Sequence, residues 1–402
     1  MKGLRKYLTP FAPDQSGAVS MCYALGGIVV IVDAGGCAGN ICGFDEPRWQ
    51  PDYLRTFSGE EMITPRVEAV FSAGLRDMDA ILGRDDLLIK KLVEASQKID
   101  AKFIALVGTP VPAVIGTDLE ADARMAERKT GLPCIAISTD GMHLYDRGIE
   151  EALLALVKRF SQETEQAETD HEKRICGVLG LNPLDLFDPA WTEAIRTSLI
   201  DRGYDEVLLY GMDGGLDALK RSGLAERNYV VSPAGIAAAK FLKDRFQTPY
   251  EVSFPADPMM ILEENPAYEA AHFDAASRIL VVHQQVLANA IRSHLEEAGA
   301  AEKIVCASWF DQKPELLEEG DVRLREEDDF TDLIQGGRWD LIIADPVLRP
   351  MAGTYDGRWI DAYHFAVSGQ RSIDRTRMAG VGQSDGKARQ EEKAEKVEIW
   401  RI

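Results

Sequence analysis

The chain has 402 residues, of which 46% are hydrophobic and 28% are charged, and its formal net charge is −21. This length predicts two or three domains with real hydrophobic cores. The acidity argues against a nucleic-acid-binding protein, because phosphate contacts need a basic face. No apolar run approaches the roughly 20 residues of a membrane span. The first residues form too short an apolar core for a secretory signal, so we expect a cytoplasmic protein.

A run of apolar, mostly β-branched residues at 28–32 ends in Asp33 and a glycine-rich loop that contains Cys37. This pattern is typical of a buried parallel strand that enters a tight loop, and such loops hold ligands at the carboxyl edge of a sheet. Glycines let the backbone approach a bulky group closely. The glycines expected to line the group are Gly35, Gly36 and Gly39.

Six cysteines are spread thinly through the chain, which indicates no disulfide framework. Cys37 and Cys42 lie among glycines and polar residues, so these two thiols are the candidates for a soft ligand. The alternative is that both are loop thiols packed under Phe44 and Trp49. The others lie in apolar runs or a short helix and are expected in cores: Cys22, Cys134, Cys176 and Cys306.

Along the rest of the chain, helical and strand-like patterns alternate, and the alternation restarts near residues 174 and 277. Such alternation predicts βαβ units and parallel sheets. Helices are predicted at 66–81, 85–99, 119–129, 149–166, 191–202, 233–246, 285–298 and 330–336. Strands are predicted at 101–108, 132–138, 174–180, 205–212, 228–232, 250–254, 277–284, 302–308 and 339–345.

We therefore predict an α/β fold of three Rossmann-like domains, each a parallel sheet flanked by helices. The domains are expected at 1–170, 171–272 and 273–364, with the C-terminal tail at 365–402 packing back on the first. The cleft between the domains is the expected substrate pocket. Neither GxGxxG after a strand nor GxxxxGK[ST] is present, which argues against NAD binding and direct ATP hydrolysis.

The loop after the strand at 132–138 carries Asp140 and His143, followed by Tyr145 and Asp146. A carboxylate beside a histidine is what proton delivery requires. The alternative is a helix start with capping, solvated side chains. Asp33 could also act as an acid, although a structural role in the loop is favoured.

Six stretches, taken in chain order, resemble the nitrogenase component 1 family over nearly the whole chain. They are GGCAG, FSAGLRDMDAILGRDDLLIKKL, LVGTPVPAVIGTDLEA, GLPCIAISTDGM, GVLGLNP and VVSPAGIAAAKFLKDRFQTPY. That family includes dinitrogenase subunits, cofactor-assembly scaffolds, and the catalytic subunits of dark-operative protochlorophyllide reductase and of a nickel-tetrapyrrole reductive cyclase.

The chain departs from the family pattern at the cysteines. Members that build a cluster between subunits usually supply three per chain, but none occurs near Ala12 and Pro13, and Pro110 stands where the third is expected. Cys37 fits the pattern and Cys42 is an addition. These departures argue against an eight-iron cluster and against nitrogen fixation.

The resemblance implies an oxidoreductase component that takes electrons from an ATP-dependent iron–sulfur reductase protein. A [4Fe–4S] cluster needs four thiolates, and Cys37 and Cys42 from each of two chains supply four. The partner chain would be a second copy or a paralogue, and Asp140, His143 and Asp33 would be the catalytic acids. The alternatives are a scaffold or carrier for metallocofactor assembly and a metal-free binding module. The substrate, and any metallocofactor or tetrapyrrole in the cleft, are left open.

Overall fold

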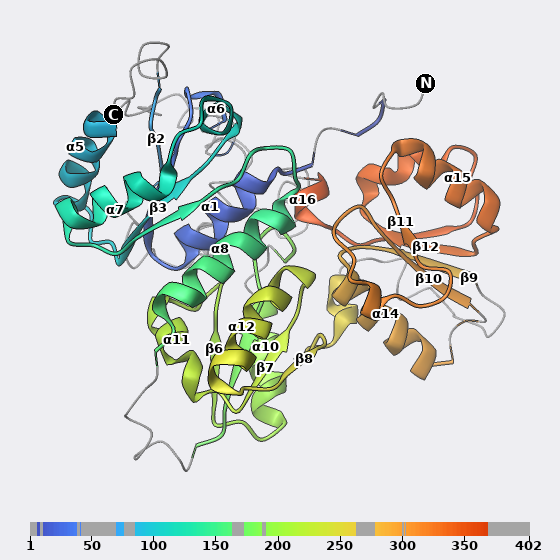
Figure 1. The fold of residues 1–402 in the computed structure, drawn as a ribbon. Helices are drawn as coiled ribbons and strands as arrows, with labels where there is room; N and C mark the ends of the chain where they lie inside the picture. Colours follow the sequence, from blue (N-terminus) through green and yellow to red (C-terminus); the bar gives the residue numbers. More distant parts are fainter. Residues whose placement is uncertain are drawn as a thin grey trace, which may run out of the picture.

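The computed structural model describes residues 6–8, 11–37, 41, 70–75, 85–162, 173–186, 190–262, 278–299, 301 and 303–368. Within them, three parallel sheets and their covering helices form three lobes around a common centre (Figure 1). We call these the first, second and third lobe in chain order. The predicted fold class, parallel sheets flanked by helices, is confirmed.

The predicted domain boundaries at 170 and 272 fall in stretches outside the described residues, so they stay predictions. The same holds for the tail beyond residue 368. No helix within the described ranges is both long and apolar enough to cross a lipid bilayer.

The first lobe has a sheet of order β2-β1-β3-β4. Its central strand is buried along its whole length, as expected of a β-branched run between two helical layers. The strands are β1 (Gly27–Ile31), β2 (Val70–Ser72), β3 (Phe103–Val107) and β4 (Cys134–Ile137). The helices are α1 (Asp14–Ala24), α5 (Asp85–Ser96), α6 (Pro110–Ile115), α7 (Leu119–Thr130) and α8 (Tyr145–Phe160).

The predicted helix at 66–81 is wrong where β2 lies. Val70 pairs in parallel register with Val29 of β1, so the sheet edge supplies backbone partners to this short apolar segment. Tertiary pairing here overrides the local helical pattern.

The second lobe has a sheet of order β6-β5-β7-β8, and the third has one of order β11-β10-β9-β12-β13. The strands of the second are β5 (Ile175–Leu179), β6 (Glu206–Leu209), β7 (Arg227–Val230) and β8 (Tyr250–Val252). Its helices are α10 (Ala190–Asp201), α11 (Leu216–Lys220) and α12 (Ile236–Phe246), with 3-10 turns η1 (Arg221–Leu224), η2 (Pro233–Gly235) and η3 (Pro258–Leu262).

The strands of the third lobe are β9 (Arg278–Val282), β10 (Lys303–Ser308), β11 (Val322–Arg323), β12 (Leu341–Ala344) and β13 (Arg358–Asp361). Its helices are α14 (Gln285–Glu297), α15 (Glu327–Gly337) and α16 (Phe365–Ser368), with 3-10 turns η4 (Pro314–Leu316) and η5 (Pro346–Ala352). The sequence pattern predicted the central strands β9, β10 and β12 but not the edge strands β11 and β13.

Helices α1 and α8 cross at the centre of the molecule, and two glycines permit the close approach. A Cβ atom on Gly17 would overlap the carbonyl oxygen of Tyr145, and one on Gly148 would overlap the carbonyl oxygen of Asp14. This crossing places the start of α1 directly against the loop that leads into α8 (Figure 1).

The N-terminal segment joins the first lobe to the third. The backbone N–H groups of Lys6, Tyr7 and Leu8 donate to the carboxylate of Glu327, at distances of 2.8, 2.9 and 2.7 Å. Phe11 packs on Trp309 with ring centroids 5.5 Å apart. Residues 298 to 321 positions apart are thereby held together.

Candidate functional site

The loop after β1 starts from a buried carboxylate. Asp33 is 1% exposed, and its Oδ1 accepts a hydrogen bond of 2.6 Å from the hydroxyl of Ser72 at the end of β2. Gly35 follows with φ +109°, a conformation that favours glycine, and no atom of the described residues lies within 4 Å of where its Cβ would be. Asp33 therefore links two strand ends at the start of the glycine loop.

Cys37 follows this loop, in a helical turn that begins at Gly36, and is half-buried. Burial and the nearby Asp33 carboxylate raise the pKa of its thiol, which opposes the thiolate form that iron needs. The other described thiols are buried, and burial raises their pKa values too, to about 12 for Cys134.

A [4Fe–4S] cluster therefore does not fit one chain by its described residues alone. They offer a single partly exposed thiol where four are needed. Cys42 and Gly39 lie outside the described residues, so the predicted Cys37–Cys42 pair stays a prediction. A fit requires the second thiol and a second chain.

Two threonine hydroxyls join the carboxyl ends of neighbouring strands in the first sheet by hydrogen bonds. Thr109 donates to the carbonyl oxygen of Val32 at 2.9 Å, and Thr139 donates to that of Gly108 at 2.7 Å. The carboxyl ends of β1, β3 and β4 are thus held side by side. The Cys37 loop and the loop after β4 consequently lie at the same edge of the sheet.

At this edge, Asp140 and His143 form a polar pair. The Nδ1 atom of His143 lies 3.2 Å from Oδ1 of Asp140 and 4.0 Å from Oδ2 of Asp14. The imidazole side chain is 59% exposed, whereas that of Asp14 is 2% exposed. The three groups each offer one ligand atom, and these atoms lie within 4.8 Å of one another.

Asp14 organises the loop from beneath. Its carboxylate accepts hydrogen bonds from the backbone N–H groups of Asp140 at 3.1 Å and Gly141 at 3.0 Å. Burial raises the pKa of Asp14, whereas the Met142 N–H and His143 lower that of Asp140. Asp140 is thus an exposed, readily ionised acid beside a solvent-facing imidazole. The pair can exchange protons with water, and its oxygen and nitrogen donors suit a hard cation better than an iron–sulfur cluster.

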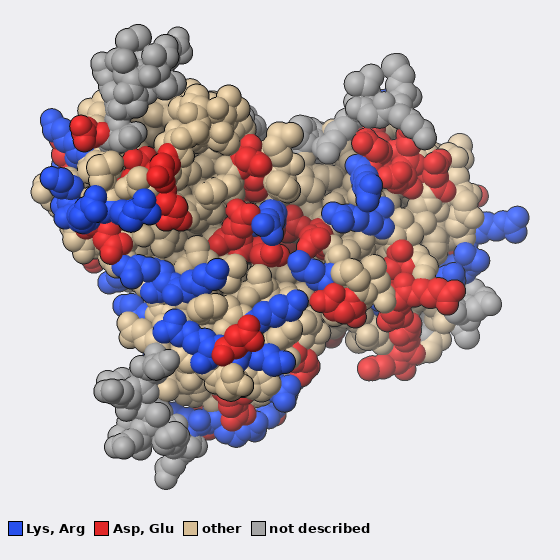
Figure 2. All heavy atoms as spheres, in the orientation of Figure 1, with Lys and Arg blue, Asp and Glu red and all other residues tan. Residues whose placement is uncertain are grey.

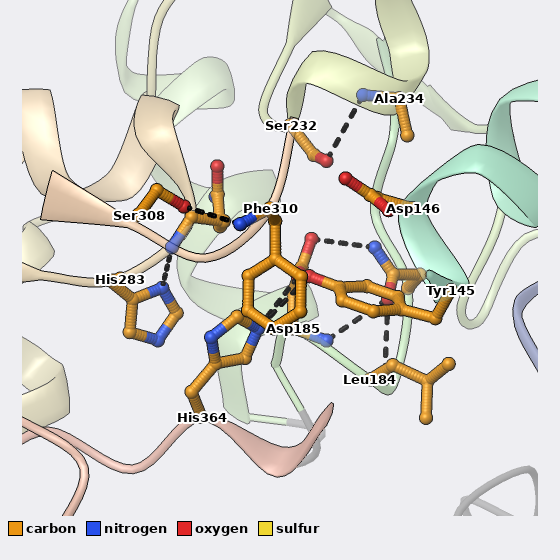
Figure 3. A network of polar contacts seen from close by, with 12 residues as sticks. Tyr145, Asp146, Leu184, Asp185, Ser232, Ala234, His283, Ser308, Phe310 and His364 are labelled. Carbon is orange, nitrogen blue, oxygen red and sulfur yellow. Dashed lines mark hydrogen bonds and ion pairs between the residues drawn. The ribbon is translucent and has the colours of Figure 1, made fainter. Parts of the chain in front are cut away.

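A second polar cluster occupies the buried junction of the three lobes (Figure 3). Tyr145 at the start of α8 donates to Oδ1 of Asp185, which follows β5, and its hydroxyl lies 3.0 Å from Nε2 of His364, which follows β13. The His364 Nε2 also lies 3.2 Å from Asp185 Oδ1. Each lobe contributes one member, and the three side chains are at most 2% exposed.

Further groups complete this junction. His283, which follows β9, stacks on His364 with ring centroids 4.2 Å apart. Its Nδ1 accepts from the Gln284 N–H at 2.9 Å, so the ring proton is on Nε2. Burial, and then His364, lower the pKa of His283 well below its usual range, so the ring is neutral. Asp345 accepts from the backbone N–H of His364 at 2.9 Å.

The junction contains a cavity of about 10 Å³, room for one water molecule. Its lining includes Phe310, Asp345 and both histidines. A substrate or a second cofactor at this point would require the lobes to move apart. Acidic side chains gather on the surface where the lobes meet, and basic ones cross the lobe drawn lowest (Figure 2).

The structure therefore brings Asp140 and His143 together, as the sequence predicts. Asp33, in contrast, is buried and bonded to Ser72. Two important residues escaped the sequence analysis, Asp14 and Asp185. Asp14 stands at a helix start, a common place for an acid, and Asp185 lies in an ordinary NPLD turn. The contacts that make them important, Asp14 with Asp140 and Asp185 with Tyr145, join residues 126 and 40 positions apart, so the local sequence did not indicate them.

Comparison with known proteins decides the family. The family model described as nitrogenase component 1 type oxidoreductase matches residues 52–261, just over half of the chain. The chain belongs to this family.

Curated relatives of this component 1 type protein include the nitrogenase iron-molybdenum cofactor biosynthesis protein NifE from Clostridium pasteurianum and from Klebsiella pneumoniae. The first is 30% identical over 202 residues, which are 49% of this chain and 41% of the relative. The second is 28% identical over 198 residues, 46% and 42% of the two chains. The matched part thus spans about two fifths of the length of these relatives.

Solved structures resemble the component 1 type fold over most of its length. Nitrogenase Cp1 at pH 6.5 superimposes with a TM-score of 0.66, covering 94% of this chain and 93% of its own, at 13% identity. Nitrogenase Cp1 at pH 5 gives a TM-score of 0.56, covering 91% and 78%, at 15% identity. At such low identity the likeness shows the fold alone.

Proposed function

We propose that this component 1 type chain is the substrate-reducing subunit of a nitrogenase-like oxidoreductase. Two chains would share one [4Fe–4S] cluster through Cys37 and Cys42 of each, and an ATP-dependent iron–sulfur protein would reduce it. The observation that carries the proposal is the position of Cys37, partly exposed in the helical turn that follows Gly35 at the carboxyl edge of the first sheet. The cluster would supply one-electron transfer.

Apolar surface at the same edge supports a second chain there. Val114 and Ile115 on α6 are 85% and 42% exposed, and Met142 in the loop before α8 is 82% exposed. Gly141 lies against Pro110, so these two segments are neighbours. Exposed apolar groups close together are typical of a surface that another chain covers. The partner would be a second copy or a paralogue.

The proposed proton-transfer pair is Asp140 and His143: the imidazole, which is exposed to water, would donate the proton, and the ionised Asp140 carboxylate beside it would orient the ring. Asp33 is better assigned to structure, since its carboxylate is buried and bonded to Ser72. A cytoplasmic location stays a prediction.

Electron transfer from the partner tests this function. The anaerobic chain, mixed with an ATP-dependent iron–sulfur reductase protein and MgATP, should show bleaching of its visible absorption. Bleaching that is absent with ADP and absent in a Cys37→Ser variant supports the proposal. A spectrum unchanged by the reductase and ATP contradicts it.

A second candidate function is that of a scaffold or carrier in metallocofactor assembly. The similarity to NifE, a protein of iron-molybdenum cofactor biosynthesis, favours it. Loading the chain with a metallocofactor and adding an apo acceptor protein distinguishes the two. Transfer of the metal to the acceptor, without bleaching by the reductase, supports the scaffold.

A further inference from the structure

The buried cluster at the junction joins all three lobes through three side chains. Tyr145 comes from the first lobe, Asp185 from the second and His364 from the third. Two of the three contacts therefore break if any one lobe moves away. Asn182 fixes the remaining carboxylate oxygen of Asp185 by donating to it at 2.7 Å.

A chain of backbone hydrogen bonds crosses the same junction. The Tyr145 N–H donates to the Ala12 carbonyl at 2.9 Å, and the Ala12 N–H donates to the Ala366 carbonyl at 3.3 Å. The Ala366 N–H in turn donates to the Leu184 carbonyl at 2.9 Å. Residue 366 lies two positions after His364, so the side-chain cluster and this chain of amides must form or break together.

Behind this connection lies the cavity of about 10 Å³ with its two histidines. The strands β9, β10, β12 and β13 all end around it, and the carboxyl ends of parallel strands are where such folds bind ligands. The cavity has room for one water molecule, so a larger ligand could enter only if the lobes moved apart.

We propose that Tyr145, Asp185 and His364 form a latch that holds the three lobes closed, and that its release in one cooperative step opens the junction to a ligand. The proposal rests on the proposed function only in treating the junction as the substrate site. The latch itself is a property of the folded chain and can be tested whether or not iron is bound.

Native-state hydrogen exchange on the full chain, followed residue by residue at increasing low concentrations of urea, tests the latch. The amides of Ala12, Tyr145 and Ala366 should converge on one opening free energy and one urea dependence. Both values should be smaller than those of amides in β5 and β9, which open by global unfolding. Three unrelated urea dependences for these amides would overturn the proposal. It would also be overturned if the three amides exchanged only through global unfolding.

A pair of tyrosine variants gives a second test. Tyr145→Phe keeps the ring but removes the hydroxyl that joins the lobes, so the three amides should exchange about tenfold faster together. The control is Tyr204→Phe, which removes a buried hydroxyl that pairs with Tyr229 at 3.3 Å within the second lobe. It should leave the three amides unchanged.

The variant results can also contradict the latch. Faster exchange at Tyr145 alone, with Ala12 and Ala366 unchanged, would show that the lobes are not coupled through this hydroxyl. Equal acceleration in both variants would show a general loss of stability instead of a latch. Should Tyr145→Phe fail to fold, the urea series on the unmodified chain decides by itself.

Discussion

The hydroxyl of Tyr145 lies 3.0 Å from Nε2 of His364, although 219 positions separate the two residues in the sequence. This contact, together with Asp185, makes the centre of the molecule a polar meeting point of three separate sheets. The surface pair Asp140–His143 lies at the other end of the same short segment, since it immediately precedes Tyr145. The start of α8 therefore connects the water-exposed Asp140–His143 pair to the buried junction of the three lobes.

The crossing of α1 and α8 depends on glycine. Gly148→Ala would push a methyl group into the carbonyl oxygen of Asp14, and the helices cannot separate without disturbing the loop at Asp140. We expect a loss of roughly 1–3 kcal/mol in the free energy of unfolding, measured by urea denaturation.

Gly336→Ala is the matched control. Gly336 also lies within a helix, α15, but among the described residues no atom lies within 4 Å of its Cβ position. This change should stabilise the chain by about 0.5–1 kcal/mol, because alanine loses less backbone entropy than glycine. Equal effects at the two positions would contradict the close helix crossing.

Asp14 and Asp140 should have separable effects. Asp14→Ala leaves the amides of Asp140 and Gly141 without their acceptor, so it should lower the free energy of unfolding by about 1–3 kcal/mol. Asp140→Asn keeps a side-chain oxygen for the Met142 N–H and should change stability by less than about 0.5 kcal/mol. If Asp140→Asn were the more destabilising change, Asp14 would not be the organising residue.

The neutral state of His283 predicts an acid-sensitive fold. Its pKa in the folded chain lies well below the usual range, whereas the unfolded chain has the ordinary value of about 6.5. Below that pH the unfolded chain binds a proton that the folded chain does not. Stability from this group is therefore complete above about pH 6.5 and falls by up to about 1.4 kcal/mol per pH unit below it.

His283→Gln isolates this effect, because the amide oxygen can still accept from the Gln284 N–H. Urea unfolding at pH 7.5 and pH 5.5 should show a larger acid loss for the unmodified chain than for the variant. The comparison is needed because burial also raises the pKa values of Asp14, Asp146 and Asp345, whose titration has the opposite sign. Identical acid losses in the two proteins would contradict a buried neutral His283.

The sequence predicted most of the parallel strands because short apolar runs such as 28–32 and 341–344 are typical of strands covered by helices on both faces. It also predicted the family and the Asp140–His143 pair, which are local in sequence. It missed β2, whose three residues become a strand only by pairing with β1.

The junction was beyond sequence reasoning for a physical reason. Tyr145, Asp185 and His364 follow no motif within their own segments. They contact one another only because the three lobes pack together. The same applies to Asp14, whose role comes from the glycine crossing of α1 and α8. Local patterns contain no information about such long-range contacts.

The central claim is that Cys37, with Cys42 and a second chain, holds one cluster, and iron and labile-sulfide analysis of anaerobically purified protein tests it most directly. The account predicts about two iron and two sulfide ions per chain, with loss of both in Cys37→Ser. Cys134→Ser, at a buried thiol bonded to the Leu132 carbonyl, should retain them. A colourless, iron-free protein from iron-replete cells, or unchanged iron in Cys37→Ser, would contradict the account.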